Sequence, residues 1–367
     1  MEFLIRISLS IFSFKMSSKI LKYTILLLAI YLWLQAYSPI LYKSSQLFPD
    51  DYRYGDLYRL SYLPQFKEEA IKCKPSPISQ KFDEIVSINL FIIGDSFTEE
   101  ERVNKNDFPT EKYQYCHWAK QTDIRLDSSK RNILILETVE RTFKEHFSKS
   151  VDNFKMENST ENNAQNNQSW KKIVKEKIEK TIVFCFPKGI EERLEHTLFN
   201  YDFFLWFREI KATLNLNFFD RIEKKVVLSK DKQHIFYSDE ADSTDSHSAF
   251  YPINHLEIDT LITQINDTRR KYLKAGFDEV YLSIIPNKVS ILSPNLGTYN
   301  HLIERIQRDP RIQTPIIDTY SIFKKYPQKY YLKSDTHWNC EGRTVWLEKT
   351  NNAILLPPFP VKNYQNP

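Results

Sequence analysis

Glycine is scarce in this chain, with six residues among 367. Each glycine is therefore expected to meet a backbone need, such as a positive φ or the close approach of a neighbouring group. Cysteine is also scarce, and its four residues form no CxxC pair, so neither a zinc site nor a disulfide framework is indicated. We expect separate free thiols in the core or in loops rather than a disulfide. The four are Cys73, Cys116, Cys185 and Cys340.

No charge of one sign dominates. The chain has 51 basic and 47 acidic residues, well mixed, and a formal net charge of +4. No basic stripe indicates a nucleic-acid partner. Apolar residues make up 41% and aromatic residues 14%, which is typical of a folded protein rather than a disordered one. The length suits one large domain or two modest ones.

One long hydrophobic run lies near the N-terminus, at residues 20–34, with Lys15 and Lys19 before it and Pro39 after it. This pattern predicts an uncleaved signal anchor, a membrane helix whose amino end lies in the cytoplasm. The alternatives are a cleaved signal peptide and a buried helix. Met16 begins a more ordinary signal, so the true start is Met1 or Met16.

The composition along the chain suggests four segments. Residues 1–37 are the signal anchor or transmembrane segment, and 38–82 form a juxtamembrane segment rich in Tyr, Pro and charge. An α/β domain follows at 83–355, with an insertion around 150–250, and 356–367 form a C-terminal tail.

An apolar, β-branched run at residues 85–93 has the length of a buried strand and stops at Gly94. Ser96 would then lie on the turn at the carboxyl end of that strand, where open α/β sheets bind ligands and where a nucleophilic hydroxyl can be exposed. Residues 98–101 predict a helix start, whose N–H groups would help to stabilise an oxyanion. The alternative is an ordinary Gly-Asp-Ser turn.

Residues 132–137 predict a second buried strand, followed by a helix to about His146. The strand at 85–93, the helix expected after Ser96 and the strand at 132–137 together predict a parallel βαβ unit. Glu140 and Arg141 would then lie at the same sheet edge as Ser96, where they would position a substrate or a loop. The alternative is that they pair with each other or cap the helix.

The rest of the chain continues the alternation of helix and strand, so we expect a doubly wound, mostly parallel sheet with helices on both faces. An aromatic stripe at 190–224 is expected to face the core or to form a wall toward an acceptor. Residues 225–237 predict a hairpin, 257–273 an amphipathic helix, 277–285 a strand and 315–318 a further strand end.

Asp335 and His337 lie two residues apart in a polar turn late in the chain. Asp335 would hold the proton on His337 Nδ1 and leave Nε2 to take the proton from Ser96. Trp338 would shield the imidazole from water, and Asn339 would cap the next helix. The alternative is an ordinary Asp/His turn under a structural Trp.

The segment 94–97 (Gly-Asp-Ser-Phe) and the late segment 335–339 (Asp-Thr-His-Trp-Asn) resemble the SGNH/GDSL hydrolase superfamily. More closely, they resemble the SGNH-like acetyltransferases of polysaccharide modification, the alginate O-acetyltransferase group, in which Asp-Thr-His-Trp-Asn-x-x-Gly is a hallmark matched here through Gly342. The pair 140–141 and the hairpin end 236–237 (Phe-Tyr) also match. The motif order is permuted, because Ser96 precedes the histidine motif here and follows it in the alginate enzymes.

The resemblance implies an SGNH/flavodoxin-like fold, with Ser96 as nucleophile, His337 as general base and Asp335 as its orienter. It implies acetyl transfer to, or ester hydrolysis on, a cell-surface polysaccharide, a membrane-bound protein partner that donates acetyl groups, and no cofactor or metal. The domain would be periplasmic and anchored in the inner membrane, or secreted if the signal is cleaved. A catalytically inactive glycan-binding or scaffold protein is the alternative. The candidates for oxyanion or substrate contacts are Gly94, Asp95, Phe97, Asn132, Glu140, Arg141, Asn287, Trp338 and Asn339.

Overall fold

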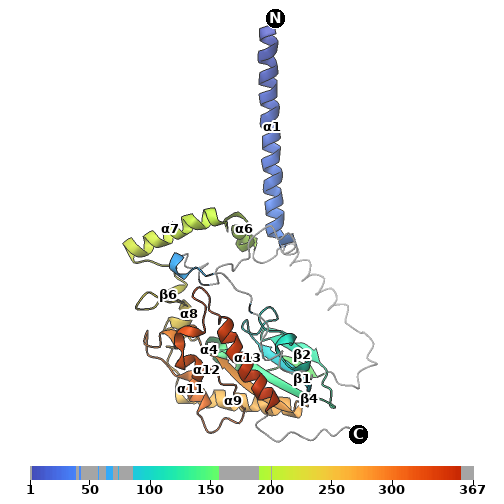
Figure 1. Cartoon of the computed structure of the whole chain (residues 1–367), viewed down its shortest axis with the longest axis vertical. Coiled ribbons are helices and arrows are strands. Elements are labelled where there is room, and N and C mark those ends of the chain that lie inside the picture. Colours follow the sequence, from blue (N-terminus) through green and yellow to red (C-terminus); the bar gives the residue numbers. More distant parts are fainter. Residues whose placement is uncertain are drawn as a thin grey trace. The chain divides into compact units, whose positions relative to one another are not determined.

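The computed structural model of the chain describes residues 2–38, 41–42, 57, 63–68, 73, 86–156, 190–199 and 201–356 (Figure 1). The chain divides into two compact units, which are treated separately below. The first unit comprises residues 1–53 and 161–211, and the second comprises 54–160 and 212–367. Cys185 and nearly all of the expected tail lie outside the described residues, as does most of the expected juxtamembrane segment.

The second unit is built on a four-stranded sheet in which all neighbouring strands are parallel. An isolated parallel bridge between Leu282 and Ile316 continues this sheet beyond its last strand. Strand β4 (Arg131–Val139), one of the two inner strands, is buried at every position, as expected for a strand that is covered on both faces. The expected α/β class with a mostly parallel sheet is therefore confirmed. The strand order is β2 (Thr110–His117), β1 (Val86–Gly94), β4 (Arg131–Val139) and β8 (Glu279–Ile285).

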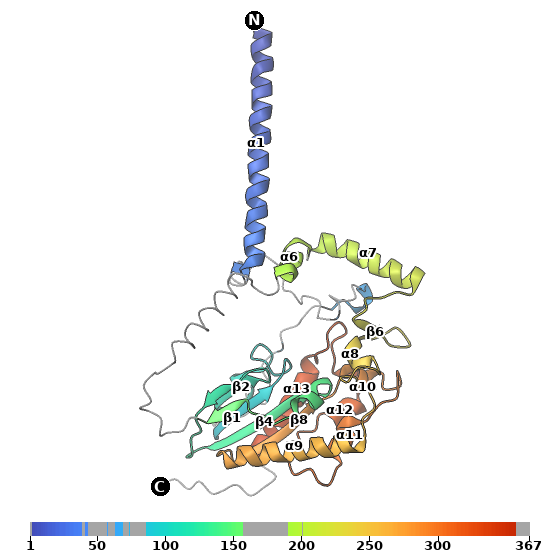
Figure 2. The ribbon, with the colours of Figure 1, turned by 180° about the vertical axis from the view of Figure 1, so that it is seen from behind.

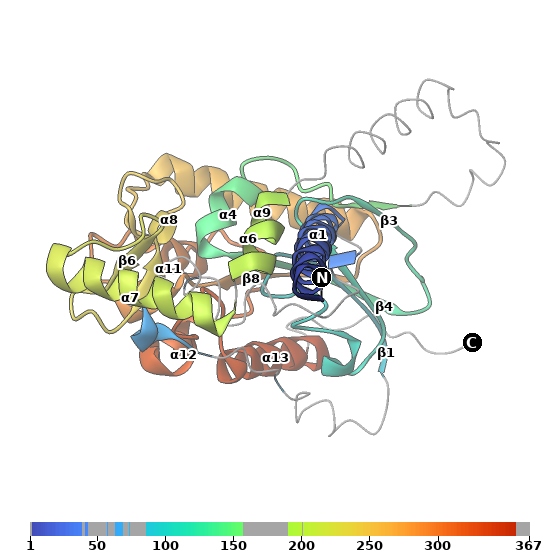
Figure 3. The ribbon, with the colours of Figure 1, turned by 90° about the horizontal axis from the view of Figure 1, so that it is seen from above.

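Helices α9 (His255–Lys274) and α13 (Cys340–Leu355) lie on opposite faces of this sheet, as the view from above shows (Figure 3). On the α13 face, Trp346 Nε1 donates to Ser283 Oγ at 3.0 Å. On the other face, the Phe91 ring of β1 meets Phe277, which follows α9, edge to face. The view from behind shows α9 running beside the strands (Figure 2). The core is thus closed from both sides, and the site forms where the strands end.

Several predicted elements of the second unit are present, including the helix after β4, the hairpin, α9 and β8. The predicted helix after Ser96 is wrong, because turns occupy that stretch. The chain also passes from β1 to β4 through η2, β2 and β3 rather than through an α-helix. The shorter elements are η1 (Pro64–Phe66), η2 (Lys105–Asp107), β3 (Thr122–Ile124), α4 (Glu140–His146), β5 (Phe154–Met156), β6 (Val226–Leu228), β7 (Ile235–Tyr237), α8 (Ser238–Ala241), α10 (Lys288–Leu292), α11 (Leu302–Gln307), α12 (Tyr320–Lys325) and η3 (Pro327–Lys329).

A disulfide joins Cys73 to Cys340, with 5.2 Å between their Cα atoms. This overturns the expectation of four free thiols. Its two cysteines lie 267 residues apart in the sequence and meet only because the chain folds. Within the described residues, Cys116 is free and buried.

The first unit contains α1 (Glu2–Tyr37), α6 (Ile190–Phe199) and the first part of α7 (Asp202–Phe219). The segment Lys19–Tyr37 of α1 is long and apolar enough to cross a membrane, so it is a candidate anchor or signal sequence. The aromatic stripe on α7 does not face a core, since most of its large apolar side chains are exposed. The expectation that this stripe faces the core is therefore wrong for α7, whereas its expectation as a wall toward an acceptor stays a prediction.

Candidate active site

Ser96 lies in the turn that follows β1, and this turn is tightly fitted to the neighbouring strand β4. A Cβ atom on Gly94 would lie 2.1 Å from Thr98 Oγ1 and 2.7 Å from Glu137 Oε2, so only glycine fits here. Glu137 Oε2 accepts hydrogen bonds from Asp95 N at 3.0 Å and from Thr98 Oγ1 at 2.7 Å. Burial, and then the charge of Asp95, raise the pKa of Glu137 well above its ordinary value, which favours its neutral form.

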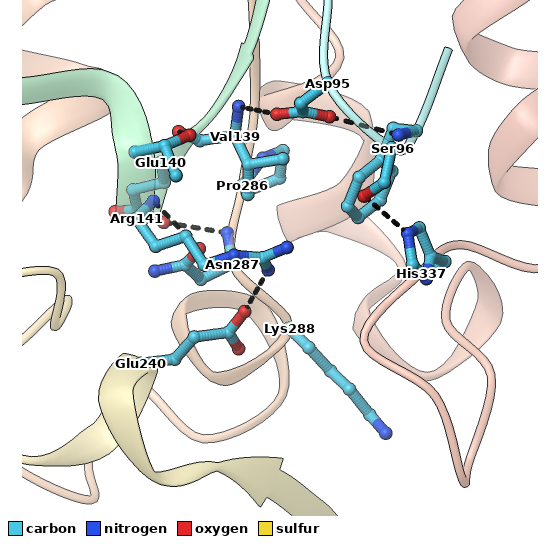
Figure 4. A network of polar contacts seen from close by, with 12 residues as sticks. Asp95, Ser96, Val139, Glu140, Arg141, Glu240, Pro286, Asn287, Lys288 and His337 are labelled. Carbon is cyan, nitrogen blue, oxygen red and sulfur yellow. Dashed lines mark hydrogen bonds and ion pairs between the residues drawn. The ribbon is translucent and has the colours of Figure 1, made fainter. Parts of the chain in front are cut away.

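Asp95 ties the turn to the end of β4. Its Oδ2 accepts from Val139 N at 2.9 Å (Figure 4). Its Oδ1 accepts from Phe97 N at 3.0 Å. Both carboxylate oxygens are therefore engaged by backbone N–H groups. The Asp95 side chain therefore links the residue after Ser96 to the end of β4 and acts as an acceptor rather than as an oxyanion donor.

His337 lies in a loop closed by an antiparallel bridge between Tyr331 and Trp338. Asn339 caps α13 as predicted, because its Oδ1 accepts the backbone N–H of Gly342 at 3.0 Å. A Cβ atom on Gly342 would lie 2.5 Å from the Tyr330 carbonyl oxygen. The first turn of α13 can therefore pack against this loop only with glycine at that position.

The two segments bring Ser96, His337 and Asp335 together in one chain of hydrogen bonds. Figure 4 shows the contact between Ser96 and His337. Ser96 Oγ lies 2.8 Å from His337 Nε2, and Asp335 Oδ1 lies 2.5 Å from His337 Nδ1. Asp335 Oδ1 also accepts the backbone N–H of His337 at 2.9 Å. Both distances to the imidazole lie near the range of about 2.6–3.2 Å expected of a nucleophile, its base and the orienter of that base.

The electrostatics of the Asp335–His337 pair favour an ionised Asp335. Burial alone would raise the pKa of the Asp335 carboxyl, but the charge of His337 and the hydrogen bonds from it hold this pKa well below its usual range. The ionised Asp335 therefore keeps a proton on His337 Nδ1. The lone pair of Nε2 then faces the Ser96 hydroxyl, which is the arrangement a general base requires.

Aromatic rings shield the imidazole. The ring of Phe97 lies 4.6 Å from the His337 ring, centroid to centroid. Trp338 meets Phe97 edge to face at 5.0 Å and is itself buried. The ring against the imidazole is thus that of Phe97, with Trp338 behind it, whereas we had expected Trp338 to be the shield.

A buried lysine braces the histidine loop. Lys288 is 1% exposed, and its Nζ donates to the Lys333 carbonyl oxygen at 2.8 Å and to that of Asp335 at 3.3 Å. On another side of the loop, Leu57 N donates to the Ser334 carbonyl at 2.8 Å. Lys288 escaped the sequence analysis because a lysine after a strand is expected to be solvated.

Glu140 begins α4 at the carboxyl end of β4 and holds the turn that follows β8. Its Oε2 accepts from Asn287 N at 2.9 Å and from Ser290 Oγ at 2.6 Å, and its Oε1 accepts from Tyr299 OH at 3.1 Å. Burial raises the pKa of Glu140 to about 7, against the effect of these hydrogen bonds. Glu140 is thus a loop-positioning residue.

Arg141 has a different acidic partner. Its Nη1 lies 2.5 Å from Glu240 Oε1, and Glu240 lies on α8, directly after the predicted hairpin. The backbone N–H of Arg141 donates to Asn287 Oδ1 at 3.1 Å. Glu240 was missed because nothing in the acidic segment that holds it distinguished one carboxylate from another.

Asn287 remains a candidate oxyanion donor, whereas Asn132 does not. Asn287 Nδ2 is buried and has no hydrogen-bond partner within the described part of the chain. Asn132 is the second residue of β4 and donates to the Asp127 carbonyl at 2.8 Å. Because β1 and β4 are parallel, Asn132 lies at the edge of the sheet opposite Ser96, so its prediction as an oxyanion donor was wrong.

No protein-family model, curated protein or solved structure matches this chain. Among the described residues, no group of three or more His, Cys, Asp or Glu side chains is placed to hold a metal ion.

Proposed function

We propose that this protein is a serine-dependent acyltransferase or esterase of SGNH type. One observation carries the proposal: Ser96 Oγ, His337 and Asp335 form a continuous chain of hydrogen bonds at the carboxyl edge of a parallel sheet. The buried, ionised Asp335 gives the pair the tautomer that activates a hydroxyl.

The chemistry follows from these atoms in two halves. Ser96 Oγ attacks the acyl carbonyl carbon while its proton passes to His337 Nε2, and the ester oxygen leaves with that proton. The product is an acyl-Ser96. An acceptor hydroxyl, from a sugar or from water, then loses its proton to Nε2 and attacks the acyl carbon, and Ser96 Oγ leaves and recovers the proton. The backbone N–H of Ser96 and Asn287 Nδ2 are the donors we propose for the oxyanion.

The sheet order supports an SGNH-type, doubly wound fold. Counting only the strands of the main sheet and the bridge at Ile316, the order is 2-1-3-4-5, which is that of flavodoxin-like sheets. In that order the second strand is added on one side of the first and the later strands on its other side. The strand order therefore reverses between the first and third strands, here β1 and β4, and ligands bind at this switch point. Ser96 follows β1 and Glu140 follows β4.

We further propose an extracytoplasmic location and a glycan acceptor. The disulfide between Cys73 and Cys340 fits an oxidising compartment, and the apolar segment Lys19–Tyr37 fits an anchor with Lys15 on its cytoplasmic side. The resemblance of the Ser96 and His337 motifs to polysaccharide O-acetyltransferases supports a cell-surface glycan as acceptor and a membrane-bound acetyl donor.

The test is the covalent intermediate. The full-length protein is incubated with p-nitrophenyl acetate and quenched in acid, and its intact mass and peptide map are recorded. We expect one added acetyl group on Ser96, and none in Ser96→Ala. Adding an oligosaccharide then separates the two activities, because a transferase forms O-acetyl sugar and an esterase forms acetate. A folded wild type that binds the oligosaccharide but is never acetylated would instead be a glycan-binding scaffold.

A further inference from the structure

Helix α7 carries a row of large apolar side chains that face outward. A surface helix normally turns polar residues toward water, so an exposed apolar face of this size indicates a surface that binds another molecule or a membrane. The spacing of three and four residues places the row along one side of the helix. Their exposed fractions run from 38% to 74%. The row, called the outer face below, consists of Phe203, Trp206, Phe207, Ile210, Leu214 and Phe218.

The opposite side of α7 already has its partners. Ala212 and Leu216 pack against a small core cluster that includes Val226 and Ile235. Leu205, on the same side, is 3% exposed. The outer face is therefore a second apolar face, in addition to the packing that secures the helix.

The start of α7 is tied to the carboxyl end of the candidate membrane span. Arg193 of α6 donates from Nε to the Ala36 carbonyl oxygen at 2.6 Å and from Nη2 to that of Tyr37 at 3.5 Å. Helix α6 thus lies against the last turn of α1 (Figure 1). Because α7 begins at Asp202, just after α6 ends at Phe199, its first turn lies near the level where the span leaves the hydrocarbon layer.

Two further features fit lipid at this level. Trp33 and Tyr37 stack at the carboxyl end of the span, with 5.0 Å between ring centroids, as in the aromatic belts of membrane interfaces. On α7 the outer face is rich in Phe and Trp, while Arg208 and Lys211 lie on its flank. Such cations can extend along apolar surface to reach lipid phosphates.

We propose that α7 is an interfacial membrane helix, which lies in the headgroup region with its outer face in the acyl chains. The protein would then have a second attachment to the lipid besides α1. The proposal rests on α1 being a membrane span and is independent of the chemistry at Ser96, because none of the residues that carry it belongs to the active site.

Spin labels test this directly in the full chain. Single cysteines replace Phe207, Ile210 and Leu214 in a background with Cys116→Ser and Cys185→Ser that keeps the disulfide. The protein is reconstituted into vesicles of phosphatidylcholine and phosphatidylglycerol. A matched label at Arg270, an exposed position of α9, serves as the control.

We expect the three outer-face labels to collide more with oxygen than with a water-soluble nickel chelate, and the Arg270 label to show the reverse. Outer-face labels as open to nickel as Arg270 would overturn the proposal. Strongly immobilised labels, shielded from both reagents or broadened by dipolar coupling, would also overturn it, because protein or a second copy would then cover the face.

A milder variant guards against misfolding of the cysteine mutants. In vesicles of brominated phosphatidylcholine, lipid should quench part of the tryptophan fluorescence of the wild type. We expect Trp206→Phe, which keeps an aromatic ring, to lose a measurable share of the quenchable fluorescence. An unchanged quenched signal in this variant would contradict lipid contact at Trp206.

Discussion

The site has two sides, which are built differently. One lies at the turn after β1 together with the histidine loop, and the other lies at the ends of β4 and β8. The first, called the Ser96 side, consists of Ser96, Asp335 and His337, whose side chains are bonded to one another. The second, called the Glu140 side, consists of Glu140, Arg141 and Asn287. Its side chains are directed mainly to backbone groups and to Ser290, Tyr299 and Glu240.

This difference separates reactivity from placement. On the Ser96 side the hydrogen bonds run from Asp335 through the His337 ring to the Ser96 hydroxyl. On the Glu140 side the buried Glu140 carboxyl and the backbone N–H of Arg141 hold the turn that carries Asn287. Within the described part of the chain, the amide donor Asn287 Nδ2 is left without a partner. We infer that the first side sets the nucleophile and that the second sets where the acyl oxygen lies.

The largest effect is expected from Asp335→Asn. The amide cannot hold a proton on His337 Nδ1, so Nε2 would carry the proton and could no longer accept one from Ser96. We expect the rate of Ser96 acetylation by p-nitrophenyl acetate to fall roughly 10³- to 10⁴-fold. Circular dichroism should show an unchanged fold. A loss below about tenfold would show that the Ser96 side is not a working relay.

Asn287→Ala tests the other side of the comparison. Loss of an oxyanion donor should slow acetylation of Ser96 by roughly 10²- to 10³-fold. The matched control is Ser290→Ala, which loosens the same turn by removing a hydrogen bond to Glu140 but keeps the amide. If the two variants slow the reaction equally, Asn287 supports the turn only and the oxyanion is bound elsewhere.

Lys288→Met should have a smaller effect. The change leaves the Lys333 and Asp335 carbonyls without the ammonium group that braces the histidine loop, so His337 should sit less exactly against Ser96. We expect a roughly 10- to 100-fold slower acylation. The apparent affinity for the ester should hardly change. Lys324→Met, at an exposed lysine, is the control and should match wild type.

Glu140→Gln should change the pH dependence of stability more than activity. The folded-state pKa of Glu140 is raised to about 7 from an ordinary 4.5. The folded state therefore binds this proton more tightly, so its contribution to stability is full below about pH 4.5 and is lost as pH rises to about 7. Urea unfolding across this window should show a flatter slope in the variant. An equal slope would place the titration elsewhere.

The local elements could be predicted from sequence because their signals are local. Strands β1 and β4 are aliphatic runs of strand length, and α9 has an apolar stripe with a helical period. The motif at Asp335 and His337 also identified both partners of Ser96. These signals need no knowledge of the rest of the chain.

The remaining features depend on long-range packing. The acidic residues after Ser96 suggested a helix start, but Glu137, from another strand, takes the hydrogen bonds of that turn. Nothing near Cys73 indicates a partner 267 residues away. On α7 the same helical period suits a core and a membrane surface, so the sequence pattern could not separate the two.

The most direct test of the account is covalent labelling of Ser96 with a fluorophosphonate, an electrophile that reacts preferentially with activated serine hydroxyls. We predict a single label on the full-length protein, located at Ser96 by peptide mapping, absent in Ser96→Ala and strongly slowed in Asp335→Asn. A correctly folded wild type that stays unlabelled, or a label that persists in Ser96→Ala, would contradict the claim that these three residues form an acyl-transfer site.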